Sequence, residues 1–316
     1  MRPVTPQPSV SIVIPAAHAA DSLLKALTSV AAQDYPNLVE VVVAAGDAAS
    51  GEVAAATGAV VVANSSGRTA TAMNLAIAHS TGEIIVRVDA HSSIPPHYVS
   101  RVVDLIETTG ADNVGGMQVP VGSTFWGKAV AAAMSSKAGA GDASYRVGGQ
   151  PGPTDTVYLG AFRRSTLERL GGYDEGFVRH QDYELNERIR ESGGTVWFDP
   201  ELQVEYRPRS SLMSLARQYF GYGTWKRWFL RKHPGSLRPR QWAPPVLIIS
   251  LGLSLVGSLL WPQFLLLPAL YAVALVVAGL LMLPHAGLPA LGTPLVLAVM
   301  HISWGLGFLI GQTREK

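Results

Sequence analysis

A long stretch without charged side chains constrains the C-terminal part of this chain. No Asp, Glu, Lys or Arg occurs from residue 241 to residue 313 of the 316 residues. A soluble domain exposes charges, whereas a helix that crosses a bilayer core needs about 20 mostly apolar residues. Residues 243–261, 264–283 and 295–311 each approach that length. We therefore predict a transmembrane region at residues 241–313 with about three helices. The alternative, a buried helical core, would need polar outer faces, and the sequence shows none.

Basic residues indicate how these predicted helices are oriented. Six precede the first span: Lys226, Arg227, Arg231, Lys232, Arg238 and Arg240. Such clusters stay on the cytoplasmic side, and residues 1–8 show no basic-then-apolar signal pattern. Three spans would place Arg314 and Lys316 outside, an objection that the six upstream residues outweigh. We expect a multi-pass protein of the plasma (inner) membrane, in contact with membrane lipids, whose preceding domain is cytoplasmic.

The first 120 residues alternate short apolar runs with helical patterns. Residues 10–15, 38–44, 59–63 and 83–88 are predicted strands, with helical stretches between them. Repeated β-α units whose strands are apolar on both faces indicate a mostly parallel, Rossmann-like sheet covered by helices. The predicted fold class is therefore α/β, and ligands of such sheets bind at the carboxyl ends of the strands.

Composition excludes several kinds of chemistry. The chain has no cysteine, which excludes disulfides, thiolate catalysis and cysteine-based zinc sites. The formal net charge of +2 identifies no partner, and we expect no nucleic acid. No G-x-G-x-x-G follows the first predicted strand, which argues against a dinucleotide-dependent oxidoreductase.

Asp89 and His91 directly follow the fourth predicted strand. Side chains two residues apart on an extended chain point the same way, so both can converge on one ion. A divalent metal with few protein ligands commonly holds a nucleoside diphosphate, and an imidazole ligand suits Mn²⁺ better than Mg²⁺. Alternatively, Asp89 caps a helix that begins near Pro95, or His91 is a loop residue. Spacing alone leaves these alternatives open.

Two further segments are candidates for function. Asp182 opens a predicted helix between His180 and Glu184, where a carboxylate can act as a base or merely stabilise the helix dipole. Residues 211–228 combine aromatic side chains at helical spacing with Lys and Arg, which is typical of an interfacial helix at lipid headgroups. An ordinary amphipathic core helix is the alternative for this second segment.

Taken together, these features resemble a known family. The matching stretches are VDAHSSIPPHYVSRVV, TVYLGAFRRSTLERLGGYDE, RHQDYELNERIRESGGTVWFDP, VEYRPRSSLMSLARQYFGYGTW and HISWGLGFLIG. The chain resembles membrane-bound family 2 glycosyltransferases of GT-A fold, especially the ExoA-like, succinoglycan-type group. The resemblance implies a cytoplasmic GT-A domain at residues 1–210, an interfacial basic segment at 211–240 and the transmembrane region at 241–313.

The resemblance also implies an activity. The expected enzyme is an inverting, metal-dependent glycosyltransferase of polysaccharide or cell-envelope glycan synthesis. It would move a sugar from a nucleotide-sugar donor, expected to be a UDP-sugar, to a hydroxyl of a lipid-linked or membrane-associated glycan. Asp89 and His91 take the place of the family's D-x-D motif and would hold Mn²⁺ or Mg²⁺. Asp182 takes the place of the catalytic base. Because a sugar hydroxyl needs a base and a polyprenyl phosphate gains little from one, Asp182 favours a hydroxyl acceptor.

Other positions take roles from the same resemblance. The donor-side residues are Asp89, Arg68, Asn74, Asp47 and Pro15, and the acceptor-side or membrane-proximal residues are Thr156, Tyr158, Gly160, Arg217, Tyr219 and Trp225.

The sequence departs from the family pattern in two places. Pro15 is followed by AAHAA instead of a polar run, and Ala45 stands where an acid normally contacts the nucleoside, although Asp47 could substitute. These departures motivate a second hypothesis, a catalytically weakened GT-A-like membrane partner or scaffold. A polyprenyl-phosphate glycosyltransferase is a further alternative.

Overall fold

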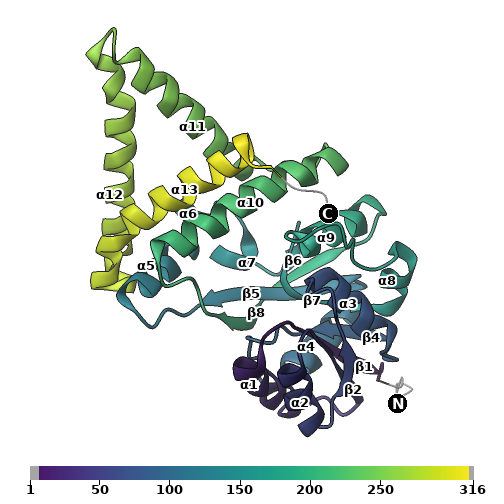
Figure 1. The fold of residues 1–316 in the computed structure, drawn as a ribbon. Helices are drawn as coiled ribbons and strands as arrows, with labels where there is room; N and C mark the ends of the chain where they lie inside the picture. The colour runs from purple at the N-terminus through teal and green to yellow at the C-terminus, as the bar shows by residue number, and fades with distance from the viewer. Residues whose placement is uncertain (1–6, 313–316) are drawn as a thin grey trace. The chain divides into compact units, whose positions relative to one another are not determined.

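The computed structural model describes residues 7–312, which form two compact units. Among these residues, the first unit comprises 7–118 and 148–206, and the second comprises 119–147 and 207–312. Residues 119–147 therefore group with the C-terminal helices (Figure 1). The three functional regions predicted from sequence, with boundaries at 210 and 240, remain a prediction. Arg314 and Lys316, used in the orientation argument, lie outside the described residues.

An eight-stranded mixed sheet organises the described part of the first unit, in the order β3-β2-β1-β4-β7-β5-β8-β6. Strands β1 to β4 pair in parallel, as predicted, and β7 pairs antiparallel with both β4 and β5. The strand bounds are β1 Val10–Ala16, β2 Leu38–Ala45, β3 Val60–Ala63, β4 Ile84–Arg87, β5 Asn113–Pro120, β6 Gly152–Pro153, β7 Tyr158–Arg163 and β8 Val196–Tyr206.

Helices cover both faces of this sheet (Figure 1). Alternate residues of a strand point to opposite faces, so Ile12 and Ile14 of β1 pack into one apolar cluster with α1 and α4, while Val13 packs into another with α3 and α9. The helix bounds are α1 Ala20–Ala31, α2 Ala48–Ala56, α3 Thr69–Ala78, α4 Tyr98–Thr109, α8 Arg164–Leu170 and α9 Gln181–Glu191. The predicted α/β fold class is confirmed.

The described part of the second unit is mostly helical and also contains Val119 and Pro120, the last two residues of β5. Its helices are α5 Phe125–Met134, α6 Lys137–Ala140, α7 Ser144–Val147, α10 Leu212–Lys232, α11 Pro239–Gly257, α12 Leu266–Ala286 and α13 Thr293–Ile310, with short 3₁₀ turns at Pro262–Leu265 and Leu288–Gly292. Helices α11, α12 and α13 correspond to the three predicted spans. Between residues 7 and 312, two segments are long and apolar enough to cross a membrane, Pro262–Ala286 and Leu288–Ile310. Averaged over its whole length, helix α11 is less apolar than these two segments, because its first turns contain Arg240, Pro244 and Pro245; no charged residue follows Arg240 in it.

Candidate active site

Arg87, the last residue of β4, brings two predicted site residues together. Its Nε and Nη2 each lie 2.8 Å from Oδ1 of Asp89, and its Nη1 pairs with Oδ1 of Asp182. Asp182 is 95 positions further along the chain and comes from the first turn of α9. The carboxylates predicted to bind the donor and to act as base are therefore joined through one guanidinium.

The Arg87 side chain is 7% exposed, so its charge requires nearby carboxylates. Burial opposes the charged form, but Asp182 and Asp89 more than offset it, and the pKa of Arg87 stays well above its ordinary value. Arg87 is thus a permanent cation. Arg87 was not among the residues predicted for the site, although a charged residue inside the apolar run IIVRV was a signal that could have identified it.

Asp182 combines access to solvent with a perturbed carboxyl group. Its side chain is 41% exposed, which leaves room for an acceptor to approach. Protein packed around the remainder of the carboxyl removes water and raises the pKa of Asp182. Arg87 opposes that rise in pKa, and the charge of Asp89 adds to it. A carboxylate with a raised pKa is a better proton acceptor than an ordinary aspartate.

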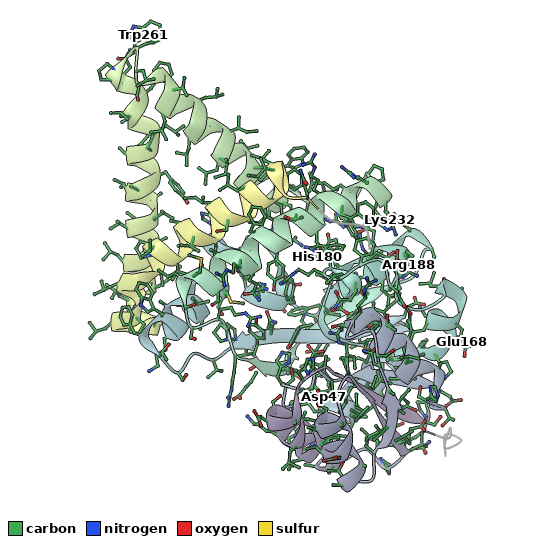
Figure 2. The ribbon with its side chains drawn as sticks, viewed as in Figure 1. Asp47, Glu168, His180, Arg188, Lys232 and Trp261 are labelled. Carbon is green, nitrogen blue, oxygen red and sulfur yellow. The ribbon has the colours of Figure 1, made fainter. Side chains whose placement is uncertain are left out.

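Helix α9 is held in place by a second arginine. Arg188 donates two 2.7 Å bonds to the buried carboxylate of Glu184 and also donates to the carbonyls of Leu170 and Gly172 (Arg188 and His180 are labelled in Figure 2). His180, directly before the helix, adopts a left-handed conformation at φ 64°. These bonds tie the helix that carries Asp182 to the turn after α8.

Asp89 and His91 could supply two metal ligands. Both bonds from Arg87 end on Oδ1 of Asp89, and no donor among the described residues bonds to its other oxygen. His91 is exposed, with its ring 6.4 Å from that of Tyr206. Within residues 7–312, no group of three or more His, Cys, Asp or Glu could hold a metal ion. A cation held by Asp89 and His91 would therefore need its other ligands from a bound diphosphate.

Asp47 lies beyond β2 and joins two strand ends (labelled in Figure 2). Its carboxylate accepts from the backbone N–H of Ser50 at 2.8 Å and of His18 at 2.7 Å. The bond from Ser50 contributes most to lowering the pKa of Asp47. Asp47 thus caps α2 and orders the AAHAA loop that follows Pro15 in β1. This structural role occupies oxygens that were predicted to contact a nucleoside.

Arg68 and Asn74 contact the turn after α8 rather than Asp89. Asn74 Nδ2 donates to the carbonyl of Tyr173 at 2.9 Å and to the carboxylate of Glu175 at 3.0 Å, and Arg68 donates to the carbonyl of Glu175 at 3.4 Å. Tyr173 is buried and interacts electrostatically with Arg87. Asn74 therefore supports the cluster through Tyr173, a residue that the sequence analysis did not single out.

Strand β7 and the residues before it approach the same region. The Tyr158 hydroxyl lies 3.2 Å from that of Ser92, three residues after Asp89. Burial raises the pKa of Tyr158, and Asp89 adds to that rise. Thr156 instead accepts a bond from Asn186 at 3.0 Å. Gly160 lies where a Cβ would collide with its neighbours. Tyr158 is thus the predicted acceptor-side residue that the structure brings toward Asp89.

The remaining predicted residues, Arg217, Tyr219 and Trp225, lie on α10 in the second unit. Tyr219 is buried, with its ring 5.4 Å from that of Tyr222. Their predicted role at the membrane side of the site remains a prediction.

Comparisons with known proteins identify the family and the fold of this chain. Residues 11–171 match the sequence model of Glycosyl transferase family 2. The succinoglycan biosynthesis protein ExoA of Rhizobium meliloti (strain 1021) is 31% identical over 245 residues, which cover 75% of this chain and 72% of that protein. The structure of the mannosyltransferase PcManGT from Pyrobaculum calidifontis, in complex with GDP-Man and Mn²⁺, aligns with a TM-score of 0.60 at 22% identity, covering 95% of this chain and 88% of that one. The predicted family and GT-A fold are confirmed.

Proposed function

The chain belongs to glycosyl transferase family 2, and we propose that it inverts the anomeric centre as it transfers a sugar from a nucleotide-sugar donor to a hydroxyl of a lipid-linked glycan. The relative ExoA is a succinoglycan biosynthesis protein, which supports a role in synthesis of a polysaccharide or cell-envelope glycan. The observation that carries the proposal is the Arg87 guanidinium, which joins Asp89 to Asp182.

In this mechanism Asp182 accepts the proton of the acceptor hydroxyl. The acceptor oxygen forms a bond to the anomeric carbon while the bond from that carbon to the donor diphosphate breaks. A single displacement inverts the configuration, and base assistance contributes roughly 10²–10⁴-fold to its rate. Arg87 positions Asp182 and keeps a positive charge between the two carboxylates throughout.

Asp89 and His91 would hold a divalent cation next to the departing diphosphate. A divalent cation bound there, Mn²⁺ or Mg²⁺, would neutralise charge on the departing diphosphate. The neighbour PcManGT was solved with Mn²⁺ and GDP-Man, which supports a cation in this chain without identifying its donor. We propose a UDP-sugar as the donor. Because the Asp47 carboxylate already accepts bonds from Ser50 and His18, other groups would have to contact the uridine.

The acceptor is proposed to be bound to the membrane. The charge-free C-terminal stretch, which includes the apolar segment Pro262–Ala286, can anchor the chain in a bilayer, and the basic residues that precede this stretch favour a cytoplasmic catalytic unit. A multi-pass anchor of this kind would keep the enzyme beside a lipid-linked glycan in the plasma membrane.

Asp182→Asn separates this mechanism from its alternatives. In detergent with Mn²⁺, we expect this variant to bind the nucleotide sugar normally and to lose transfer by roughly 10²–10⁴-fold. Asp89→Asn should instead weaken donor binding, measured by calorimetry. Asp104→Asn is the matched control, because Asp104 is an exposed aspartate of α4. Near-normal transfer by Asp182→Asn would contradict the base assignment and favour an ionised polyprenyl phosphate acceptor. Failure of the unmodified protein to bind any nucleotide sugar would favour the alternative hypothesis of a catalytically weakened membrane partner or scaffold.

A further inference from the structure

The two segments that could cross a membrane have different surroundings. In an 18-residue apolar window of the segment that contains α12, 6% of the residues are buried in the protein, whereas in the corresponding window of the segment that contains α13 the share is 33%. Helix α13 exposes only Leu295, Ile302 and Ile310 strongly. Its remaining residues are fully or partly covered by other helices of the second unit.

The first half of α13 packs against helices that carry exposed lysines. A Cβ on Gly292, just before α13, would lie 3.1 Å from Phe125 and 3.2 Å from Trp126 of α5, the helix that exposes Lys128. Further along, Nε2 of His301 lies 2.9 Å from the carbonyl of Ala138 in α6. Helix α6 begins at the exposed Lys137.

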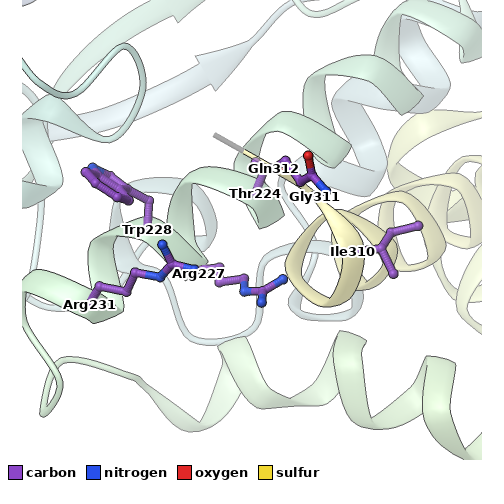
Figure 3. Close-up of a pocket in the computed structure, with 7 residues that line it drawn as sticks. All are labelled: Thr224, Arg227, Trp228, Arg231, Ile310, Gly311 and Gln312. Atoms are coloured by element: carbon purple, nitrogen blue, oxygen red, sulfur yellow. The ribbon is translucent and has the colours of Figure 1, made fainter. Parts of the chain in front are cut away.

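The other end of α13 packs against the basic end of α10. Thr224 donates to the carbonyl of Gly307 at 3.2 Å, and Arg227 donates to that of Leu309 at 2.9 Å. A cavity of about 350 Å³ lies where the two helix ends meet (Figure 3). Its lining residues are Thr224, Arg227, Trp228, Arg231, Ile310, Gly311 and Gln312. Both of its arginines are exposed.

Charged side chains therefore flank α13 at its start, its middle and its end. At 1.5 Å per residue, its 18 residues extend about 27 Å. If α13 crossed a bilayer, Lys128 and Arg227 would lie near opposite surfaces and Lys137 within the hydrocarbon. Charges at that depth are strongly unfavourable. The contacts of α13 are consistent instead with a helix that lies in the plane of the membrane surface.

Helices α11 and α12 form an apolar hairpin on this helix. The hydroxyl of Ser254 in α11 donates to the carbonyl of Phe264, which closes the tip. Leu259, Leu260 and Trp261 at the tip are 83%, 72% and 54% exposed. Figure 2 labels Trp261 at the tip, where α11 meets the turn that precedes α12.

The hairpin base rests on both halves of α13. Gly305 packs against Pro244 near the start of α11, and Gly279 of α12 packs against Pro294 near the start of α13. Helices α11, α12 and α13 contain 19, 21 and 18 residues and contact one another at their ends, so they form a triangle with α13 as its base. At 1.5 Å per residue, the tip of the hairpin lies about 27 Å from α13. That height is close to the ~30 Å hydrocarbon core of a bilayer.

We propose that α11 and α12 enter the lipid bilayer as a hairpin that runs out and back, while α13 lies along the membrane surface beside α5, α6 and α10. Gln312 then lies on the same side of the membrane as the sheet-containing unit. The occupant of the exposed hairpin surface is the bilayer, because neither helix contains a charged residue between Trp242 and Ala286. This inference does not depend on the proposed catalytic mechanism.

The absence of cysteine from the chain gives a direct test. Single variants Glu52→Cys, Gln263→Cys and Gln312→Cys, at exposed positions in the first unit, at the tip and after α13, are expressed as full chains. Each is treated with a membrane-impermeant maleimide in sealed vesicles of both orientations. We expect Glu52→Cys and Gln312→Cys to react from the same side, and Gln263→Cys not to react from that side.

Two results would overturn the proposal. Reaction of Gln312→Cys only from the side opposite to Glu52→Cys would show that α13 crosses the bilayer. Reaction of Gln263→Cys from the same side as Glu52→Cys would show that the hairpin does not insert, as when a second copy of the chain covers it. The unmodified, cysteine-free chain is the control for labelling, and the accessibility of Glu52→Cys in each preparation reports its orientation.

Discussion

At the scale of single residues, Arg87 accounts for the arrangement of the candidate active site. It is a buried cation at the end of a central strand, and its partners are the two carboxylates assigned to donor binding and base catalysis. Because a guanidinium stays charged in proteins, it can hold both carboxylates without giving up a proton. We regard Arg87 as a positioning residue, since it acts on the reaction through Asp89 and Asp182.

Replacing Arg87 tests that role. Arg87→Gln should lower transfer by about 10²-fold, the order expected when a catalytic group is misplaced. It should also shift the pH profile, because Arg87 lowers the pKa of Asp182 against the effect of burial. Transfer is lost as pH falls through the pKa of Asp182. Removal of the Arg87 charge raises that pKa and therefore moves the acid limb of the pH–activity profile to higher pH. Arg87→Lys should retain more activity than Arg87→Gln and should show a smaller shift of the pH profile.

The control for this measurement is Arg101→Gln. Arg101 pairs with the buried Asp199 away from the candidate site, so its loss reports the effect of breaking an ion pair in this sheet-containing unit. An unchanged acid limb in Arg87→Gln, with activity lowered only as far as in Arg101→Gln, would contradict the positioning role.

At the scale of elements, glycines allow α10 and α13 to pack closely. A Cβ on Gly307 would collide with the backbone of Phe220, whereas a Cβ on Gly252 of α11 would meet nothing within 4 Å. Gly→Ala inside a helix normally stabilises by about 1 kcal/mol, but overpacking costs about 1–3 kcal/mol. We therefore expect Gly307→Ala to lower the melting temperature in detergent and Gly252→Ala to leave it unchanged or higher. Equal effects of the two substitutions would contradict close packing of α10 on α13.

The sequence predicted the elements better than it predicted their partners. Strands β1 to β4 are continuous apolar runs, and their parallel pairing follows from the alternation with helices. The antiparallel insertion of β7 between β4 and β5 was not predictable, because it joins segments far apart in the chain. Arg87 was missed for a related reason, since its importance depends on Asp182 from a distant helix. Asn74 and Asp47 were assigned to the donor, yet their described bonds hold loops.

At the scale of the whole molecule, the chain combines a GT-A unit with a helical unit that carries an apolar hairpin. Composition alone indicated the apolar C-terminal region, because the charge-free stretch begins within α11, but it did not indicate that residues 119–147 group with that region. It could not distinguish a crossing helix from one on the surface, since α12 and α13 are both apolar and similar in length. That difference appears only when the neighbours of each helix are known.

The carboxylates of Asp89 and Asp182 are proposed to serve one reaction centre. The most direct measurement is a structure of the full chain in a lipid nanodisc with UDP and Mn²⁺. We predict a cation bonded to Asp89, His91 and the diphosphate, with the Asp182 carboxylate facing the same cavity. A diphosphate bound away from Asp89, or an Asp182 carboxylate that faces a separate cavity, would show that the two carboxylates do not share a reaction centre.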